Sequence, residues 1–156
     1  LCIRSSWLTM RGIRTLELRI HKQSENATAI AAALEKNPYV KRVFHPSLKS
    51  NPYHEIAVKE TGGKYFGGML TIELEDNLDK MNKFIQSLRL VHYAMTLGGY
   101  RTTMSYPPFS SHDNLTPEER HAIGISDGML RISVGIEDAQ DLVTDLEQAL
   151  EKAYKE

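Results

Sequence analysis

An arginine interrupts an alternating apolar segment late in the sequence, at residues 130–134. Arg131 is flanked by Leu130 and Ile132, which is the pattern of a β-strand with one buried face, and Gly135 ends the alternation. One interpretation places the guanidinium on the solvent face of the strand. The other makes it a fixed two-pronged donor for a carboxylate, a geometry that arginine supplies better than lysine. The strand pattern alone leaves both interpretations open.

A second candidate for chemistry is the run Thr-Leu-Gly-Gly at residues 96–99. Its two glycines allow close backbone approach and a positive φ. An ordinary β-bulge or turn explains this run as well as a loop that lines a ligand site does. The six histidines of the chain form neither Cys/His pairs nor a His-Glu-x-x-His helix, so we predict no metal site.

The elements that position these residues follow from hydrophobic periodicity. Apolar residues at helical spacing predict one long helix over residues 7–35, ended by Asn37 and Pro38. A capping box at Thr116 and Glu119 predicts a helix start, and Asp76 and Asp138 are predicted caps of two others. Strands are predicted near residues 40–44, 65–74, 90–93, 100–105 and 130–134, and further helices at 53–59 and 138–154. We therefore predict an α+β fold with a mostly antiparallel small sheet, covered by helices on one face, and a long N-terminal helix.

Composition narrows the class of protein. The chain has 156 residues, with 19 basic and 20 acidic residues for a net charge of −1, so a nucleic-acid partner is not indicated. No apolar run approaches the roughly 20 residues that cross a bilayer, so no membrane partner is predicted either. The single cysteine, Cys2, excludes an internal disulfide and fits a reducing cytosol. We predict a cytoplasmic protein.

Several motifs in order along the chain resemble one family. They include Leu-Thr-Met-Arg-Gly-Ile-Arg-Thr-Leu at residues 8–16, Phe-Gly-Gly-Met at residues 66–69, the run at 96–99, and the arginine strand. Together they resemble the C-terminal domain of the pyridoxal-phosphate enzymes of Cys/Met metabolism, the transsulfuration group of cystathionine synthases and lyases, methionine lyase and homoserine-ester sulfhydrylases. The resemblance implies the C-terminal domain of a fold-type I pyridoxal-phosphate enzyme. On this basis residues 1–6 are a non-family edge and residues 7–156 a single domain, with the large cofactor domain absent.

The resemblance also implies roles for single residues. Arg131 corresponds to the arginine that binds the substrate carboxylate. Thr96 stands where the family usually has serine, with its hydroxyl near the catalytic amine, and the backbone of Leu97 lies near the substrate carboxylate. The implied substrate-binding residues are therefore Arg131, Thr96 and Leu97. His112 matches a family histidine, for which a structural hydrogen bond is favoured over proton transfer.

Three departures from the family pattern point to substrate selectivity. Arg101 stands where many γ-processing members have glutamate, so its cation would attract an anionic distal group, or it points into solvent. Tyr106 replaces a histidine, and Tyr100 is bulkier than the usual small residue. We predict that Arg101, Tyr100 and Tyr106 influence selectivity. The reaction specificity of this protein therefore cannot be inferred from that of any one relative.

The implied cofactor is pyridoxal phosphate, bound mainly by the absent domain. No lysine of this chain lies in the family's Ser-x-x-Thr-Lys context, so no catalytic or cofactor-binding residue is predicted here and the chain alone is expected to be inactive. The complete enzyme is expected to be a C–S lyase or transferase of cystathionine, homocysteine and methionine metabolism, a homo-oligomer and by resemblance a tetramer. One alternative is a stand-alone inactive remnant that serves as a binding or oligomerisation module. Another is a small α+β domain with an unrelated ligand.

Overall fold

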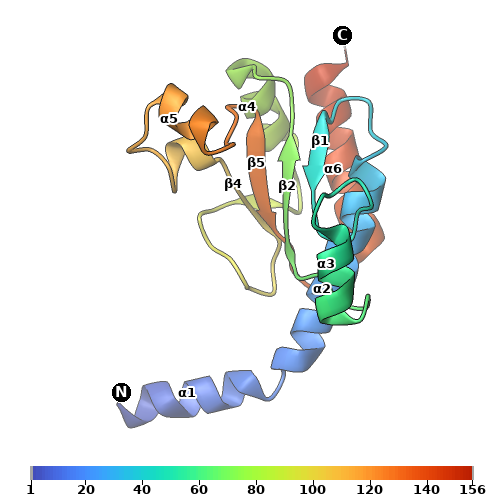
Figure 1. Ribbon diagram of the computed structural model, residues 1–156. Helices are drawn as coiled ribbons and strands as arrows, with labels where there is room; N and C mark the ends of the chain where they lie inside the picture. Colours follow the sequence, from blue (N-terminus) through green and yellow to red (C-terminus); the bar gives the residue numbers. More distant parts are fainter. Residues whose placement is uncertain (1, 156) are drawn as a thin grey trace.

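A computed structural model describes residues 2–155 of the chain (Figure 1). Its elements, in chain order, are α1 (Ile3–Ile13), α2 (Leu16–Leu34), β1 (Arg42–Phe44), α3 (His54–Thr61), β2 (Met69–Glu73), α4 (Leu78–Ser87), β3 (His92–Tyr93), β4 (Thr103–Ser105), the 3-10 helix η1 (Pro107–Phe109), α5 (Pro117–Ala122), β5 (Met129–Ser133) and α6 (Ala139–Tyr154). Within these residues no helix is both long enough and apolar enough to span a bilayer.

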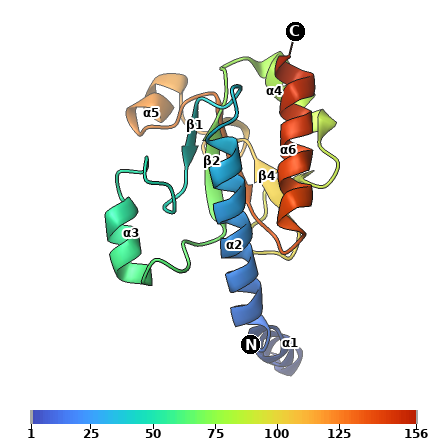
Figure 2. The same ribbon diagram turned by 90° about the vertical axis from the view of Figure 1, so that its right-hand side faces the viewer.

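The five strands form one mixed sheet in the order β1-β2-β5-β4-β3. Three neighbouring pairs are antiparallel, and the short edge strand β3 runs parallel to β4. Figure 2 shows α2 and α6 lying across one face of this sheet, and α4 packs against α6. In Figure 1 the segment with α5 lies on the opposite side of the strands from α2 and α6. The α+β class is confirmed, while "mostly antiparallel" describes the mixed sheet only roughly.

Strand alternation separates the two faces of the sheet. The side chains that face the helices are fully buried or nearly so: Leu70, Ile72, Met104, Leu130 and Ile132. They pack against fully buried leucines of α6, namely Leu142, Leu146 and Leu150. Each such burial contributes roughly 1.5–3 kcal/mol. The residues between them, which include Arg131, lie on the opposite face, which we call the open face.

The predicted helix of residues 7–35 is in fact two helices. α1 ends at Ile13 and α2 begins at Leu16, with the backbone of Thr15 outside the helical region at φ −109° and ψ 7°. Gly12 and the β-branched Ile13 and Thr15 have low helix propensity, and the Thr15 hydroxyl turns back to donate to the Gly12 carbonyl. Because no residue of α1 is buried, no packing compensates for these local preferences. A single long N-terminal helix was therefore only roughly right.

The N-terminal ends of α4, α5 and α6 can be compared with the predicted capping residues. The Thr116 hydroxyl accepts from the Glu119 amide while the Glu119 carboxylate accepts from the Thr116 amide, which confirms the capping box. Asp138 caps α6 as predicted. The prediction for Asp76 was wrong by one residue, because the neighbouring Asn77 accepts from the first amides of α4. Caps depend on contacts two or three residues away, so the sequence is informative about them.

We expect α1 to be the least stable helix of this chain. Trp7 is 58% exposed and Met10 64% exposed, so α1 has an apolar surface but no partner within residues 2–155. In hydrogen exchange, the amides of α1 are expected to be at least about 100-fold less protected than those of α6. Light scattering at rising concentration is expected to show association through this surface. A monomer at high concentration with well-protected α1 amides would contradict both expectations.

A buried carboxylate fixes the turn that leads into β3. Asp145 of α6 is only 4% exposed, and its two oxygens accept from the amides of Arg89, Leu90 and Val91 at 2.8–3.2 Å. Three consecutive amides therefore depend on one side chain.

Replacing Asp145 with asparagine is expected to lower the free energy of unfolding by about 2–4 kcal/mol, because a buried NH2 group would then face amide donors that lose their acceptor. The measurement is urea unfolding followed by circular dichroism. Glu147→Gln, an exposed carboxylate on the same helix, is the matched control and is expected to change stability by less than about 0.5 kcal/mol. Equal effects of the two substitutions would show that the turn does not depend on Asp145.

Candidate functional site

Arg131 lies at the centre of the open face. Its strand β5 is flanked by β2 and β4, where Thr71 and Ser105 are its partners in register. The residue is half-buried, in contrast to Leu130 and Ile132, which are 0% exposed. Among residues 2–155, no carboxylate or carbonyl oxygen bonds its guanidinium. The strand therefore fixes the backbone of Arg131, while its guanidinium has no hydrogen-bond or ion-pair partner among these residues.

The loop of residues 96–102 lies beside the end of β5 and is held by its backbone. The Gly98 amide donates to the Ser133 hydroxyl at 3.0 Å. The carboxamide of Gln23, from α2, donates to the Gly99 carbonyl at 2.7 Å. The backbone amide of Ile136, in the turn after β5, donates to the Tyr100 carbonyl at 2.9 Å. These bonds come from α2, from β5 and from the turn after β5, all of them distant from the loop in sequence.

The end of the loop is fixed by a buried cluster around Thr102. The Glu137 carboxylate accepts from the Thr102 amide at 2.6 Å and from the Thr102 hydroxyl at 2.9 Å. That hydroxyl in turn accepts from the Gly135 amide at 2.9 Å. Asn26, which is 0% exposed, donates to the carbonyls of Gly135 and Glu137. The loop and the turn after β5 therefore form one unit.

Arg131 and Ser133 share one face of β5, since they are two residues apart. Their backbones lie roughly 7 Å apart along the strand. Because Ser133 holds the loop at Gly98, the strand brings the loop containing Thr96 and Leu97 close to the arginine. Leu97 is 68% exposed, and Thr96 is exposed as well. An arginine, a hydroxyl and an exposed loop backbone can together bind a small carboxylate.

Two of the three predicted selectivity residues lie together on the surface. The guanidinium of Arg101 lies over the ring of Tyr100, 5.6 Å from its centroid. Both residues line a hollow of ≈ 310 Å³, together with His92 and Glu137. Within residues 2–155 the guanidinium of Arg101 makes no ion pair. A role toward an anionic group stays a prediction.

Tyr106, the third predicted selectivity residue, lies apart from this pair. It is 4% exposed, and its hydroxyl donates to the Asp127 carbonyl at 2.9 Å. Its ring meets Phe109 edge-on with centroids 4.9 Å apart. Burial, and then the charge of Asp127, raise the pKa of Tyr106 to about 12. In this chain the side chain is a structural group of the core beneath η1, and the structure does not bring it beside Tyr100 and Arg101.

The predicted family histidine lies in the loop after η1. The amide of His112 donates to the Pro107 carbonyl at 3.0 Å, and its Nδ1 lies 2.7 Å from the Ser111 hydroxyl. These local bonds support the structural interpretation of His112. Among the described residues no group of three or more His, Cys, Asp or Glu side chains is arranged to hold a metal ion.

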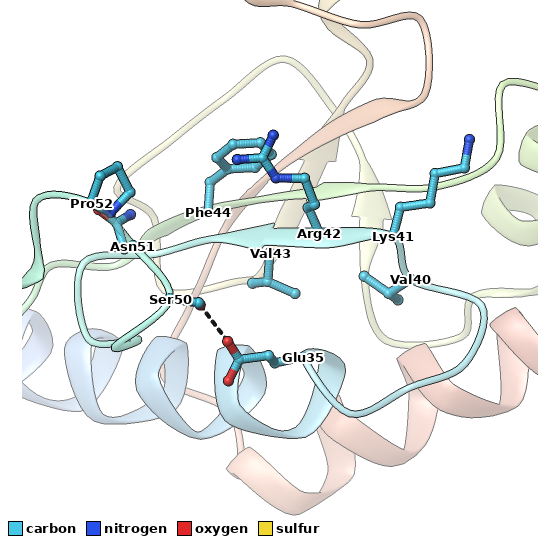
Figure 3. A pocket seen from close by; sticks show the side chains of 9 residues that line it. All are labelled: Glu35, Val40, Lys41, Arg42, Val43, Phe44, Ser50, Asn51 and Pro52. Carbon is cyan, nitrogen blue, oxygen red and sulfur yellow. Dashed lines mark hydrogen bonds between the residues drawn. The ribbon is translucent and has the colours of Figure 1, made fainter.

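Another hollow, of ≈ 150 Å³, opens beside the edge strand β1 (Figure 3). The Glu35 carboxylate accepts from the Ser50 hydroxyl there. Arg42 lies over the ring of Phe44, 4.6 Å from its centroid. Since β2 and β5 separate β1 from the loop of residues 96–102, this hollow is not part of the Arg131 site. It contains none of the predicted site residues.

Sequence reasoning missed the residues that hold the loop. These are Gln23, Asn26, Thr102, Ser133 and Glu137. Only Ser133 had a usable signal, because strand alternation places it on the same face as Arg131. The others act from α2, from the strand edge and from the turn before α6. Their roles depend on contacts across the fold.

The comparisons with known proteins agree on one family. The family model described as "Cys/Met metabolism PLP-dependent enzyme" matches residues 2–151. The match begins ahead of the boundary predicted at residue 7. Cystathionine beta-lyase of Coxiella burnetii is 42% identical over 93% of this chain and 37% of its own length. Cystathionine gamma-lyase of Bos taurus is 41% identical over 94% of this chain and 36% of its own.

Solved structures give the same result for the fold. Cystathionine gamma synthase from Xanthomonas oryzae pv. oryzae, in complex with aminoacrylate and cysteine, has a TM-score of 0.86 and 41% identity, and the match covers 94% of this chain and 37% of that one. A putative O-acetylhomoserine (thiol)-lyase from Campylobacter jejuni, with N'-pyridoxyl-lysine-5'-monophosphate, has a TM-score of 0.89 and 32% identity over 95% of this chain and 35% of that one. The chain thus spans little more than a third of the relatives that it matches.

Proposed function

Because this chain belongs to the family of Cys/Met metabolism enzymes that depend on pyridoxal phosphate, we propose that it is the C-terminal, substrate-orienting domain of a C–S lyase or transferase acting on sulfur amino acids. Pyridoxal phosphate is the cofactor of the family. The observation that carries the proposal is the free guanidinium of Arg131, fixed on the open face beside an anchored, exposed loop.

In this proposal Arg131 binds the α-carboxylate of the amino-acid substrate with two parallel hydrogen bonds. The Thr96 hydroxyl and the backbone at Leu97 flank the same group. Holding the carboxylate fixes the rotation of the substrate about its Cα, and so decides which bond is aligned for reaction. Arg101 and Tyr100 contribute to selectivity for the distal end of the substrate, and Tyr106 contributes through the packing below η1.

The residues around Arg131 fit the substrate better than they fit the cofactor. Pyridoxal phosphate supplies an electron sink when it is linked to an amine. The strands on either side of Arg131, β2 and β4, and β5 itself contain no lysine. The site offers one cation and several hydroxyls, a set suited to a carboxylate. We propose that an upstream domain binds the cofactor and supplies the lysine.

The same proposal covers the organisation of the whole protein. The chain spans 37% of the Coxiella burnetii relative, which leaves room for an upstream cofactor domain in a protein of similar length. Residues 7–156 would form the C-terminal domain and residues 1–6 its edge. A cytoplasmic homo-oligomer, by family resemblance a tetramer, is the assembly we propose.

The test is to read the coding DNA upstream of Leu1 and to assay the encoded protein. We expect an open reading frame joined to this chain that encodes lysine in a Ser-x-x-Thr-Lys context. The purified product is expected to release a thiol or a 2-oxo acid from L-cystathionine or L-methionine. A stop codon directly upstream, with no such activity, would instead favour a stand-alone binding or oligomerisation module.

A further inference from the structure

The loop of residues 96–102 combines exposed side chains with buried anchors. Leu97 is 68% exposed and Tyr100 62% exposed, whereas Thr102 is 0% exposed. Loops with exposed side chains are usually the mobile parts of a fold. This loop is instead held at Gly98, Gly99, Tyr100 and Thr102 by bonds from α2, β5 and the turn after β5. These hydrogen bonds therefore hold the loop of residues 96–102 in one conformation, although its exposed side chains are not packed against the core.

We infer that Thr102 and Glu137 are positioning residues, which hold this loop in register with Arg131 and so set the affinity for the substrate carboxylate. The inference rests on the proposed function, because it assigns these residues to the same site. Thr102 is 0% exposed, and its side chain is bonded to the Glu137 carboxylate and to the Gly135 amide. Both act through the backbone of the loop.

The Thr102–Glu137 contact has little freedom to adjust. The Thr102 hydroxyl both donates to Glu137 and accepts from the Gly135 amide, each at 2.9 Å. A Cβ atom at Gly135 would lie 2.4 Å from the Tyr100 carbonyl, so the turn and the loop are in direct contact. Movement of Glu137 must therefore move Thr102, and with it the loop that ends there.

The strand β5 carries the arginine and one of these anchors. Ser133 holds Gly98 and lies on the same face of β5 as Arg131. Beyond Ser133, the chain turns at Gly135 into Glu137, which holds Thr102. When the anchor at Thr102 is lost, the loop gains conformations that substrate binding must again exclude. The free-energy cost of ordering the backbone of even one residue corresponds to about a tenfold loss of affinity for the substrate.

The experiment compares variants of the complete enzyme, with L-cystathionine or L-methionine, whichever it turns over, as the probe substrate. Thr102→Val removes the hydroxyl at nearly constant volume, and Thr102→Ser retains it. We expect Thr102→Val to raise KM about tenfold while kcat changes by less than about threefold. Thr102→Ser is expected to restore the KM of the unmodified enzyme, and Glu137→Gln to raise KM in the same direction as Thr102→Val.

A matched control separates positioning from general destabilisation. Thr116→Val also removes a hydroxyl that accepts from a backbone amide, but at the start of α5. It is expected to lower the thermal midpoint with KM unchanged. Hydrogen exchange is expected to show faster exchange at Gly98 in Thr102→Val and no change there in Thr116→Val.

The outcomes distinguish this inference from the proposed function. If Arg131→Lys lowers kcat/KM but Thr102→Val leaves KM unchanged, the positioning role is wrong and the carboxylate site stands. If Thr116→Val raises KM as much as Thr102→Val, the effect is general destabilisation and the inference is also wrong. If Arg131→Lys leaves kcat/KM unchanged, the proposed function fails and the positioning role fails with it.

Discussion

The 156-residue chain on its own is expected to be catalytically silent. Mixed with pyridoxal phosphate, it should develop no saturable visible absorption band and form no 2-oxo acid from L-cystathionine or L-methionine. The physical reason is that no lysine lies in the family's Ser-x-x-Thr-Lys context and the three central strands of the open face contain none. Without that amine, the activity should lie about 10⁴-fold or more below that of a complete enzyme.

The measurement is an absorbance titration followed by borohydride reduction and mass spectrometry of the peptides. Scattered surface lysines are expected to react weakly, at many positions and without saturation. The complete protein, carrying its upstream lysine, is the positive control. A stoichiometric adduct trapped on one lysine of this chain would contradict the expectation and move the cofactor site into the chain itself.

The parts of the fold that the sequence predicted depend on local interactions. The alternation around Arg131 correctly predicts a strand in which Leu130 and Ile132 face the core and Arg131, between them, points to the opposite side, because neighbouring side chains of a strand alternate. The capping box at Thr116 and the cap at Asp138 were predictable for the same reason, since their partners lie within three residues. The long first helix failed at Thr15, where weak local preferences decide the structure because α1 buries nothing.

The anchors of the loop could not be predicted, because their partners are distant in the sequence. Asn26 and Gly135 are 109 residues apart, and Gln23 and Gly99 are 76 apart. A polar residue on a helix gives no local sign of which distant carbonyl it will meet. Tyr106 also has a distant partner, since it is 4% exposed and its hydroxyl donates to the carbonyl of Asp127, 21 residues away; its influence on selectivity stays a prediction.

The role of Arg131 can be separated into its charge and its geometry by two substitutions in the complete enzyme. Arg131→Lys retains the cation but loses the two-pronged donor, and Arg131→Ala loses both. Loss of a charge-assisted bidentate contact is expected to cost about 2–4 kcal/mol of transition-state stabilisation, which corresponds to roughly 30-fold to 1000-fold in kcat/KM. The fold and the cofactor spectrum are expected to be retained, because the side chain lies on the open face, away from the core.

The most direct test of the account is therefore kcat/KM of Arg131→Ala, measured beside its cofactor spectrum and thermal midpoint. Arg42→Ala, an exposed arginine on strand β1, is the matched control and is expected to keep kcat/KM unchanged. The account predicts a loss of 30-fold or more for Arg131→Ala alone, about 2 kcal/mol, in a folded protein with an unchanged spectrum. Near-normal turnover of Arg131→Ala, or a loss explained entirely by unfolding, would make Arg131 an ordinary strand residue and remove the proposed substrate site.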